Sequence, residues 1–203
     1  MPRVKSKTKN KAGKPYPCDR CDKKIRAKEP YYEWSFRHGG THRQHLSHGY
    51  PRQSQLTESK MSSAYAAIEA AEDAIGDAED VDAIRTALED CGNEIETVAQ
   101  DYQDGIDNMP ESLQQGGTAQ ESADKIESLN SFKDELESTA SGLEDFDEDE
   151  PEEPKEEAAN TPEQFAREHE EWEAEHAEWQ NKFNDHLEEQ KTSATDALGN
   201  FEL

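Results

Sequence analysis

Apolar residues in the middle of the chain recur at alternating spacings of three and four, the pattern of a helix that packs one face against other helices. The pattern predicts helices over roughly 55–76, about 81–109 and about 118–143. Their apolar stripes contain Met61, Tyr65, Ile68 and Ile75, then Val81, Ile84, Leu88, Cys91, Ile95, Val98 and Tyr102, then Ile126, Leu129, Phe132, Leu136 and Leu143. The first two stripes do not keep one phase across 76–81, so we expect a hairpin rather than one rod. Three helices with short loops predict an antiparallel three-helix coiled-coil bundle over residues 53–145.

A terminal amphipathic helix is predicted over residues 161–190. Thr161 is a typical N-cap, and Pro162 follows it at the first helical position. The stripe of this helix again alternates by four and three and contains Phe165, His169, Trp172, His176, Trp179 and Phe183. Large aromatic side chains on an acidic helix indicate a docking surface for a protein partner or a second copy of the chain. The predicted partner-binding residues are Phe165, Trp172, Trp179 and Phe183, and residues 191–203 are expected to be a flexible tail.

A shorter period appears near the start of the chain. Tyr32, Trp34 and Phe36 alternate with polar residues, which predicts a short strand. Gly39 and Gly40 follow it and indicate a turn.

Composition limits how large a core the chain can form. Leu, Ile, Val and Phe together number 26 of 203 residues, and the net charge is −26. Such a composition lies near that of disordered chains, so only long thin helices and small stapled modules are expected. No long apolar run and no signal peptide are visible, and three cysteines do not suggest a disulfide framework, so we expect a cytoplasmic protein.

The charge is segregated along the chain. Residues 1–52 have 14 Lys and Arg against 4 acidic residues, whereas residues 53–203 have 8 against 44. Residues 1–15 are rich in lysine without an apolar face, and we expect a disordered basic arm there. Residues 146–160 combine acidic residues with prolines, and we expect a disordered acidic linker.

A cysteine pair and a histidine cluster in the basic part suggest a metal site. Cys18 and Cys21 have the spacing of a zinc knuckle, and four histidines follow, at positions 38, 42, 45 and 48. A structural zinc needs four thiolate or imidazole ligands. The spacing favours Cys18, Cys21, His45 and His48, with a strand and a turn between the two pairs. His42 with His45 remains an alternative, and His38 with His42 is disfavoured because Gly39 and Gly40 would break a shared helix.

These residues resemble a known kind of domain. Cys18 and Cys21, Ile25, Tyr31-Tyr32 and Trp34, then His45 and His48, are similar to the first zinc half of a LIM-type domain. The likeness covers about residues 16–50 and departs from the family in having His48 as the fourth ligand and in lacking a second zinc half. It implies a treble-clef-like binding module over residues 16–52 with one structural Zn²⁺. Residues 51–57, "PRQSQLT", also resemble small uncharacterised proteins of tailed bacteriophages, which would place this one in the host cytoplasm.

The predicted fold class is therefore mainly α: a zinc module, a helical bundle, an acidic linker and a terminal helix. The favoured function is a non-enzymatic interaction protein whose basic head binds nucleic acid or another polyanion, without contacting a membrane. The predicted polyanion-binding residues are Lys5, Lys7, Lys9, Lys11, Lys14, Lys23, Lys24, Arg26 and Arg43. An alternative is a structural, assembly or host-takeover protein with a purely structural zinc. A zinc-dependent hydrolase or nuclease is the least favoured, because no general base lies in a motif with the histidines.

Overall fold

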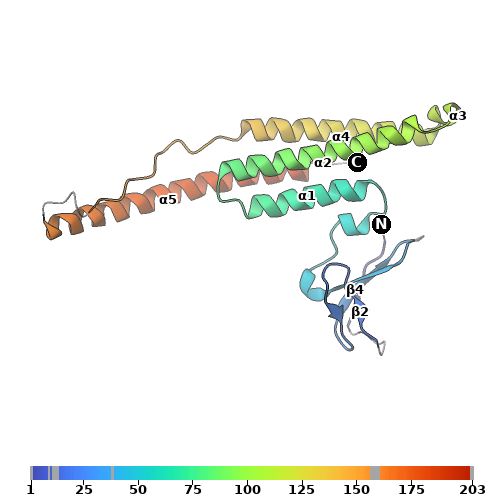
Figure 1. Cartoon of the computed structure of the whole chain (residues 1–203), viewed down its shortest axis with the longest axis horizontal. Helices are drawn as coiled ribbons and strands as arrows, with labels where there is room; N and C mark the ends of the chain where they lie inside the picture. Colours follow the sequence, from blue (N-terminus) through green and yellow to red (C-terminus); the bar gives the residue numbers. More distant parts are fainter. Residues whose placement is uncertain (1, 9, 11–13, 38, 156–160, 202–203) are drawn as a thin grey trace. The chain divides into compact units, whose positions relative to one another are not determined.

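Five α-helices and five short strands are present in the computed structural model, which describes residues 2–8, 10, 14–37, 39–155 and 161–201 (Figure 1). The protein is mainly helical, as the sequence predicts. It divides into two units, the first formed by residues 1–70 and 94–130 and the second by residues 71–93 and 131–203.

The basic part of the first unit contains two small antiparallel sheets. The strands β1 (Lys5–Lys7), β4 (Tyr31–Ser35) and β5 (Thr41–His45) form one sheet in the order β1-β4-β5. The strands β2 (Tyr16–Pro17) and β3 (Lys24–Ile25) form the other. The alternation around Tyr32 and Trp34 thus does become a strand, with Trp34 opposite His42 and Tyr31 opposite His45.

The basic arm differs from its prediction. Residues 1–15 were expected to be disordered, whereas Lys5–Lys7 pair with Tyr31–Glu33 of β4. Asn10 is buried, and its backbone exchanges hydrogen bonds with Lys28 and Glu29. The pairing uses backbone groups at the edge of β4, so it needs no apolar side chains in the arm.

A connecting segment joins the sheets to the helices of the first unit. It contains the 3₁₀ turns η1 (Leu46–His48) and η2 (Ser54–Leu56), and α1 (Met61–Gly76) begins later than the predicted residue 55. Contacts to Glu69 of α1 account for the later first residue of this helix. The Glu69 carboxylate accepts hydrogen bonds from the backbone N–H and the hydroxyl of Ser54, at 2.9 and 2.6 Å. Trp34 also donates its indole N–H to the Gln55 carbonyl at 3.0 Å, so residues 54 and 55 are fixed from both sides.

The remaining helices are α2 (Val81–Asp107), α3 (Glu111–Gln114), α4 (Gly117–Gly142) and α5 (Pro162–Gly199). The predicted stripes form the buried core: Ile68, Ile95, Val98 and Leu129 in the first unit, and Ile75, Val81, Ile84, Leu88, Cys91, Phe132, Leu136 and Leu143 in the second. Thr161 caps α5 as expected, accepting a hydrogen bond from the Gln164 N–H.

The end of α5 also differs from its prediction. Residues 191–203 were expected to be a flexible tail, but the helix continues to Gly199, and Leu187, Ala194, Ala197 and Leu198 are buried in the second unit. The Phe201 ring lies 4.7 Å from the ring of Phe132, and the Asn200 amide donates to Glu135. A fourth helical segment therefore joins the predicted three in this unit. Residues 202–203 lie outside the described part of the chain.

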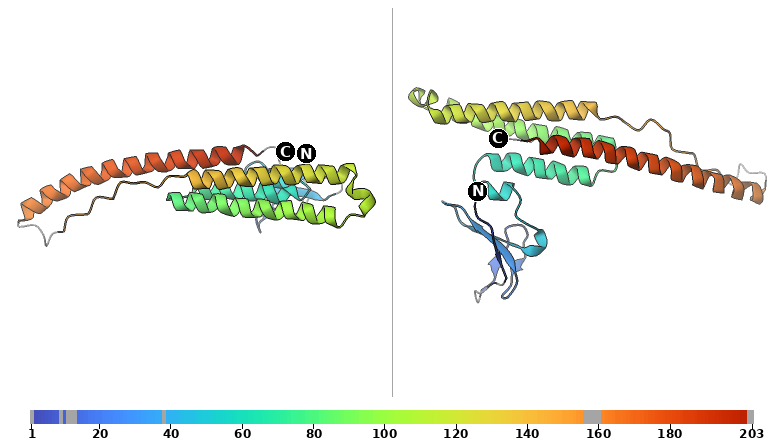
Figure 2. Two further views of the ribbon diagram at one scale, coloured as in Figure 1. Left: turned by 90° about the horizontal axis from the view of Figure 1, so that it is seen from above. Right: turned by 180° about the vertical axis from the view of Figure 1, so that it is seen from behind.

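The acidic linker is a third difference. Within the predicted 146–160, residues 146–155 have no regular secondary structure but lie along α5 instead of being free (Figures 1 and 2). Residues 156–160 fall outside the described ranges.

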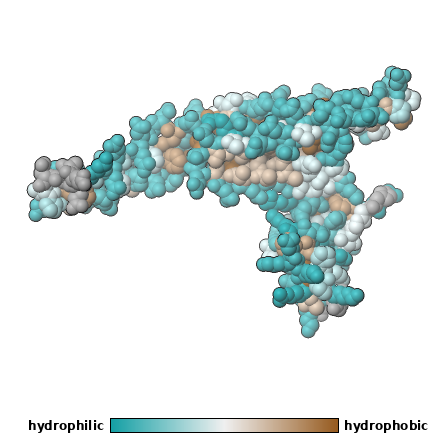
Figure 3. Space-filling view, in the orientation of Figure 1, coloured by the Kyte–Doolittle hydropathy of each residue, from teal (hydrophilic) through white to brown (hydrophobic). Residues whose placement is uncertain are grey.

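Hydrophilic side chains dominate the helical surface seen in Figure 3, as expected for a chain with 48 acidic residues. None of the helices in the described ranges is long and apolar enough to cross a membrane.

Leu88 provides a test of the helical core. It is 0% exposed in α2, so Leu88→Asp removes apolar packing worth about 3 kcal/mol and also buries a charge. We expect the cooperative thermal transition followed by circular dichroism at 222 nm to fall steeply or disappear. Thr86→Asp, on the exposed side of the same helix, should shift it by only a few degrees. Equal effects of the two changes would contradict this core.

Candidate metal centre

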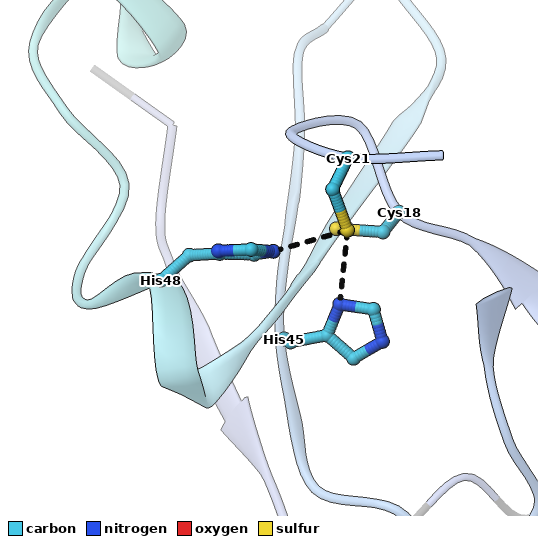
Figure 4. A group of neighbouring side chains, drawn as sticks. All are labelled: Cys18, Cys21, His45 and His48. Atoms are coloured by element: carbon cyan, nitrogen blue, oxygen red, sulfur yellow. Dashed lines mark hydrogen bonds between the residues drawn. The ribbon is translucent and has the colours of Figure 1, made fainter. Parts of the chain in front are cut away.

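Four side chains from the β2–β3 loop, β5 and η1 converge beside the small β2–β3 sheet. Cys18 and Cys21 lie in the loop between β2 and β3, His45 is the last residue of β5, and His48 ends η1. Their ligand atoms all lie within 4.8 Å of one another (Figure 4). The structure therefore brings together the four residues that the Cys and His spacings favoured.

The distances fit a tetrahedral ion. Bond lengths of about 2.3 Å for Zn–S and 2.0 Å for Zn–N place neighbouring ligand atoms about 3.3–3.8 Å apart. The Cys21 sulfur lies 3.7 Å from His45 Nδ1 and 3.2 Å from His48 Nε2, and the dashed lines in Figure 4 join these atoms. All three cysteines are free thiols, so Cys18 and Cys21 are not consumed by a disulfide.

Local structure explains how each pair is presented. The β2–β3 pairing of Tyr16 with Ile25 closes the loop that holds both cysteines. Leu46–His48 then form a single 3₁₀ turn, in which His48 follows His45 by three residues, one turn of such a helix. We expected this pair at the entry of the long helix, but α1 begins only at Met61.

The surroundings of the site favour ligation. Cys18 packs with Ile25 and Tyr31 in a small buried cluster that Tyr16 and Cys21 flank. Burial, together with the charges of His45, Arg20 and Lys23, lowers the pKa of His48 below its usual value. The neutral imidazole is the form that binds a metal ion.

Charged groups lie behind two of the ligands. His45 directs Nδ1 toward the cluster, and its Nε2 lies 3.9 Å from the Glu29 carboxylate, which is beyond hydrogen-bond distance. Arg20 donates to the His48 carbonyl at 2.8 Å. Neither Glu29 nor Arg20 was identified from the sequence, because nothing in their spacing distinguishes them from surface charges.

Asp19 was also missed, and it joins the two halves of the site. Its backbone N–H donates to the Arg43 carbonyl, and its carboxylate accepts from the Arg43 N–H, both at 2.8 Å. The same carboxylate lies 3.2 Å from His42 Nδ1. Asp19 therefore fixes the cysteine loop against β5.

The alternative ligand His42 does not join the cluster. Its ring stacks on Trp34, with centroids 5.6 Å apart, and faces Asp19. His38 lies outside the described residues.

The predicted polyanion-binding residues divide into two groups. Lys5, Lys14, Lys23, Lys24 and Arg26 are exposed. Lys7 and Arg43 instead pair with Glu33, at 3.4 and 3.1 Å, and the Arg43 guanidinium lies over the Tyr16 ring. Lys9 and Lys11 fall among the residues that are not described. Arg43 is thus mainly a structural residue, a role that its spacing in the sequence did not reveal.

The predicted partner-binding residues lie together along α5. Phe165, Trp172, Trp179 and Phe183 are all partly buried rather than fully exposed. The acidic segment before α5 contacts Trp172, Trp179 and Phe183, whereas the Phe165 ring lies against His169 of the same helix.

Comparison of the chain with protein-family models, with curated proteins and with solved structures gives no match.

Metal content tests the site directly. We expect about one zinc per purified chain, measured by inductively coupled plasma mass spectrometry, because the described residues provide one four-ligand set. Cys18→Ser should remove most of the metal. Cys91→Ser is the matched control, because Cys91 is buried in α2 and is not one of the four clustered ligands, and it should leave the zinc content unchanged. Zinc-free protein, or two zinc ions per chain, would contradict this assignment.

Asp19 gives a second test. Asp19→Ala removes the contact between the cysteine loop and β5 without removing a ligand, and changes of this kind lower metal affinity by about tenfold or more. Asp22→Ala in the same loop, where the side chain is exposed, should have little effect. Competition with a chromophoric zinc chelator measures both affinities, and equal values for the two variants would exclude this role for Asp19.

Proposed function

We propose that this protein is a non-enzymatic interaction protein, in which a zinc-stapled basic module binds nucleic acid or another polyanion and the acidic helices dock protein partners. The single observation on which the proposal rests is the exposed basic surface of the module. Lys5, Lys14, Lys23, Lys24 and Arg26 are exposed, and within the described ranges none of their side chains forms an ion pair. Unpaired cations of this kind are the groups that neutralise phosphates.

The metal does not reduce this charge. A Zn²⁺ ion bound by two thiolates and two neutral imidazoles contributes no net charge. Residues 1–52, with 14 basic and 4 acidic residues, therefore keep a net charge of +10 when zinc is bound. The folded module with zinc bound should consequently attract polyanions.

We propose that the zinc is structural and that the module is treble-clef-like, with the cysteine loop, the β4–β5 hairpin and the η1 turn as its parts. Four protein ligands leave zinc no open position for a water molecule, which a hydrolytic zinc requires. The same ligand set supports the view that the metal replaces a large apolar core in this part of the chain.

The mode of binding follows from the kinds of residue present. Lysines are flexible point charges that contact phosphates, and sequence readout needs side chains fixed against base edges. Binding should therefore depend strongly on salt and little on sequence. A purely structural zinc protein without this binding is the competing proposal.

A salt titration with the full-length protein distinguishes the two. Wild-type protein should bind a labelled DNA duplex, with an affinity that falls steeply between about 50 and 200 mM salt, and Lys23→Gln with Lys24→Gln should lower the slope of log K against log[salt] by about two. Lys155→Gln with Arg167→Gln is the matched control, since it removes two exposed charges from the acidic part and should leave the slope unchanged.

Two duplexes of unrelated sequence and a single-stranded oligonucleotide complete the series, with fluorescence anisotropy as the readout. Zinc-loaded protein that fails to bind any of them at 50 mM salt would exclude the polyanion proposal. Equal loss of slope in both double variants would show that the module surface is not the binding site.

A further inference from the structure

The acidic residues between α4 and α5 form an ordered contact with one face of α5. We call residues 144–155 the strap, and we call the stripe formed by Phe165, His169, Trp172, His176, Trp179, Phe183 and His186 the α5 seam. Figures 1 and 2 show the chain after α4 continuing in the direction of α4, and α5 then running back alongside it. All strap and seam residues belong to the second unit.

The first contact is aromatic. The Phe146 ring lies against three seam residues, with centroids 5.8 Å from Trp179, 5.6 Å from Phe183 and 5.6 Å from His186. His186 Nε2 also donates to the Glu144 carbonyl at 2.7 Å. Phe146 is therefore the apolar anchor of the strap.

The seam then recognises the strap backbone. Trp179 donates its indole N–H to the Glu148 carbonyl at 2.9 Å, and Trp172 donates to the Pro151 carbonyl at 3.0 Å. Indole N–H groups are donors only, so these two tryptophans select an extended segment that presents its carbonyl groups.

Side chains on the same face of α5 also contact the carboxylates of the strap. Lys182 pairs with Glu148 at 3.1 Å, and this contact raises the pKa of Lys182. His176 Nε2 lies 3.0 Å from the Glu150 carboxylate, and His169 Nε2 lies 3.8 Å from that of Glu153. One lysine and two imidazoles on this face thus meet acidic side chains two to three residues apart along the strap.

Helix and strap run in opposite directions with matching lengths. From His186 to His169 the helix rises by about 25 Å, at 1.5 Å per residue. From Glu144 to Glu153 an extended chain covers about 28 Å, at 3.1 Å per residue. Two residues of the strap therefore cover about the same length as half a heptad of α5. The contacts between strap and seam can thus repeat along both segments without strain.

We propose that the α5 seam is a docking surface for extended acidic peptides that contain an aromatic residue, and that the strap is its occupant within the same chain. A partner segment with an aromatic residue followed by carboxylates two, four and seven positions later displaces the strap. This inference deepens the protein-docking part of the proposed function and does not depend on the zinc module or on polyanion binding.

The strap is suited to exchange with a partner segment because it leaves the seam residues only partly buried. No residue of α5 before Leu187 is buried, whereas Leu187, Ala194, Ala197 and Leu198 fix the later part of the helix in the core. The strap has no regular secondary structure, and its acidic side chains are exposed. Because the strap is tethered beside the seam, its high local concentration lowers the apparent affinity for a competing peptide.

The probe for this proposal is a fluorescein-labelled peptide with the sequence of residues 144–155, "EDFDEDEPEEPK", titrated with the full-length protein. Phe146→Ala, which removes the anchor of the strap, should bind the peptide at least tenfold more tightly than wild type. Adding Trp179→Ala to Phe146→Ala should abolish the gain. A peptide with alanine in place of its phenylalanine should bind weakly to every variant. Circular dichroism at 222 nm confirms that each protein remains helical.

Because the peptide is acidic, Lys23→Gln with Lys24→Gln in the Phe146→Ala background shows whether it binds the basic module instead. Binding lost in that variant and kept in the Trp179→Ala variant would overturn the proposal while leaving the polyanion proposal intact. Equal affinity of wild type and Phe146→Ala, or no binding by Phe146→Ala at millimolar peptide, would also overturn it.

Discussion

The shortage of large apolar side chains is the constraint on which the rest of the structure depends. With 26 Leu, Ile, Val and Phe residues in 203, no segment can bury enough surface to form a thick core. The chain meets this constraint in two ways. Helices pack along narrow stripes that need one apolar residue every three or four positions, and the basic part gathers two cysteines and two histidines around a site suited to zinc. A zinc ion bound at this site would supply folding free energy in addition to the small cluster around Cys18, Ile25 and Tyr31.

The same shortage explains the strap. The aromatic residues of α5 before Leu187 have too little apolar surface around them to be buried by another helix, and a polar segment covers them instead. Phe146 is the only large apolar side chain in that segment, so backbone carbonyls and carboxylates make the remaining contacts. Such a contact orders the chain while leaving most of its surface in water, which is compatible with release. The later part of α5, with Ala194 and Leu198 buried, behaves as an ordinary core helix.

The features that could be predicted are those whose pattern is local in the sequence. The four site residues were found because ligand chemistry restricts both residue type and spacing, and the stripes through Ile84, Leu88 and Leu129 were found because helical period is a local property. The pairing of β1 was not predictable, because Lys5–Lys7 join β4 through backbone groups that every residue possesses. The end of α5 was missed because Ala194 and Ala197 give a weak apolar signal. Asp19 and Arg20 acquire their roles only when distant segments meet.

Acidic residues have two different effects in this molecule. Along α2 and α4 many of them lie on the exposed sides of the helices, where they contribute to net charge and not to a specific contact. In the strap, Glu148, Glu150 and Glu153 each face a basic group of α5, so position matters as well as charge. Within the second unit, three histidines and Lys182 are concentrated on this one face, although the acidic part of the chain has 44 carboxylates against 8 Lys and Arg. A helix that merely needed solubility would have no reason to place all three of its histidines on its aromatic stripe. Their placement supports the proposal that the α5 seam binds one acidic segment in a fixed register.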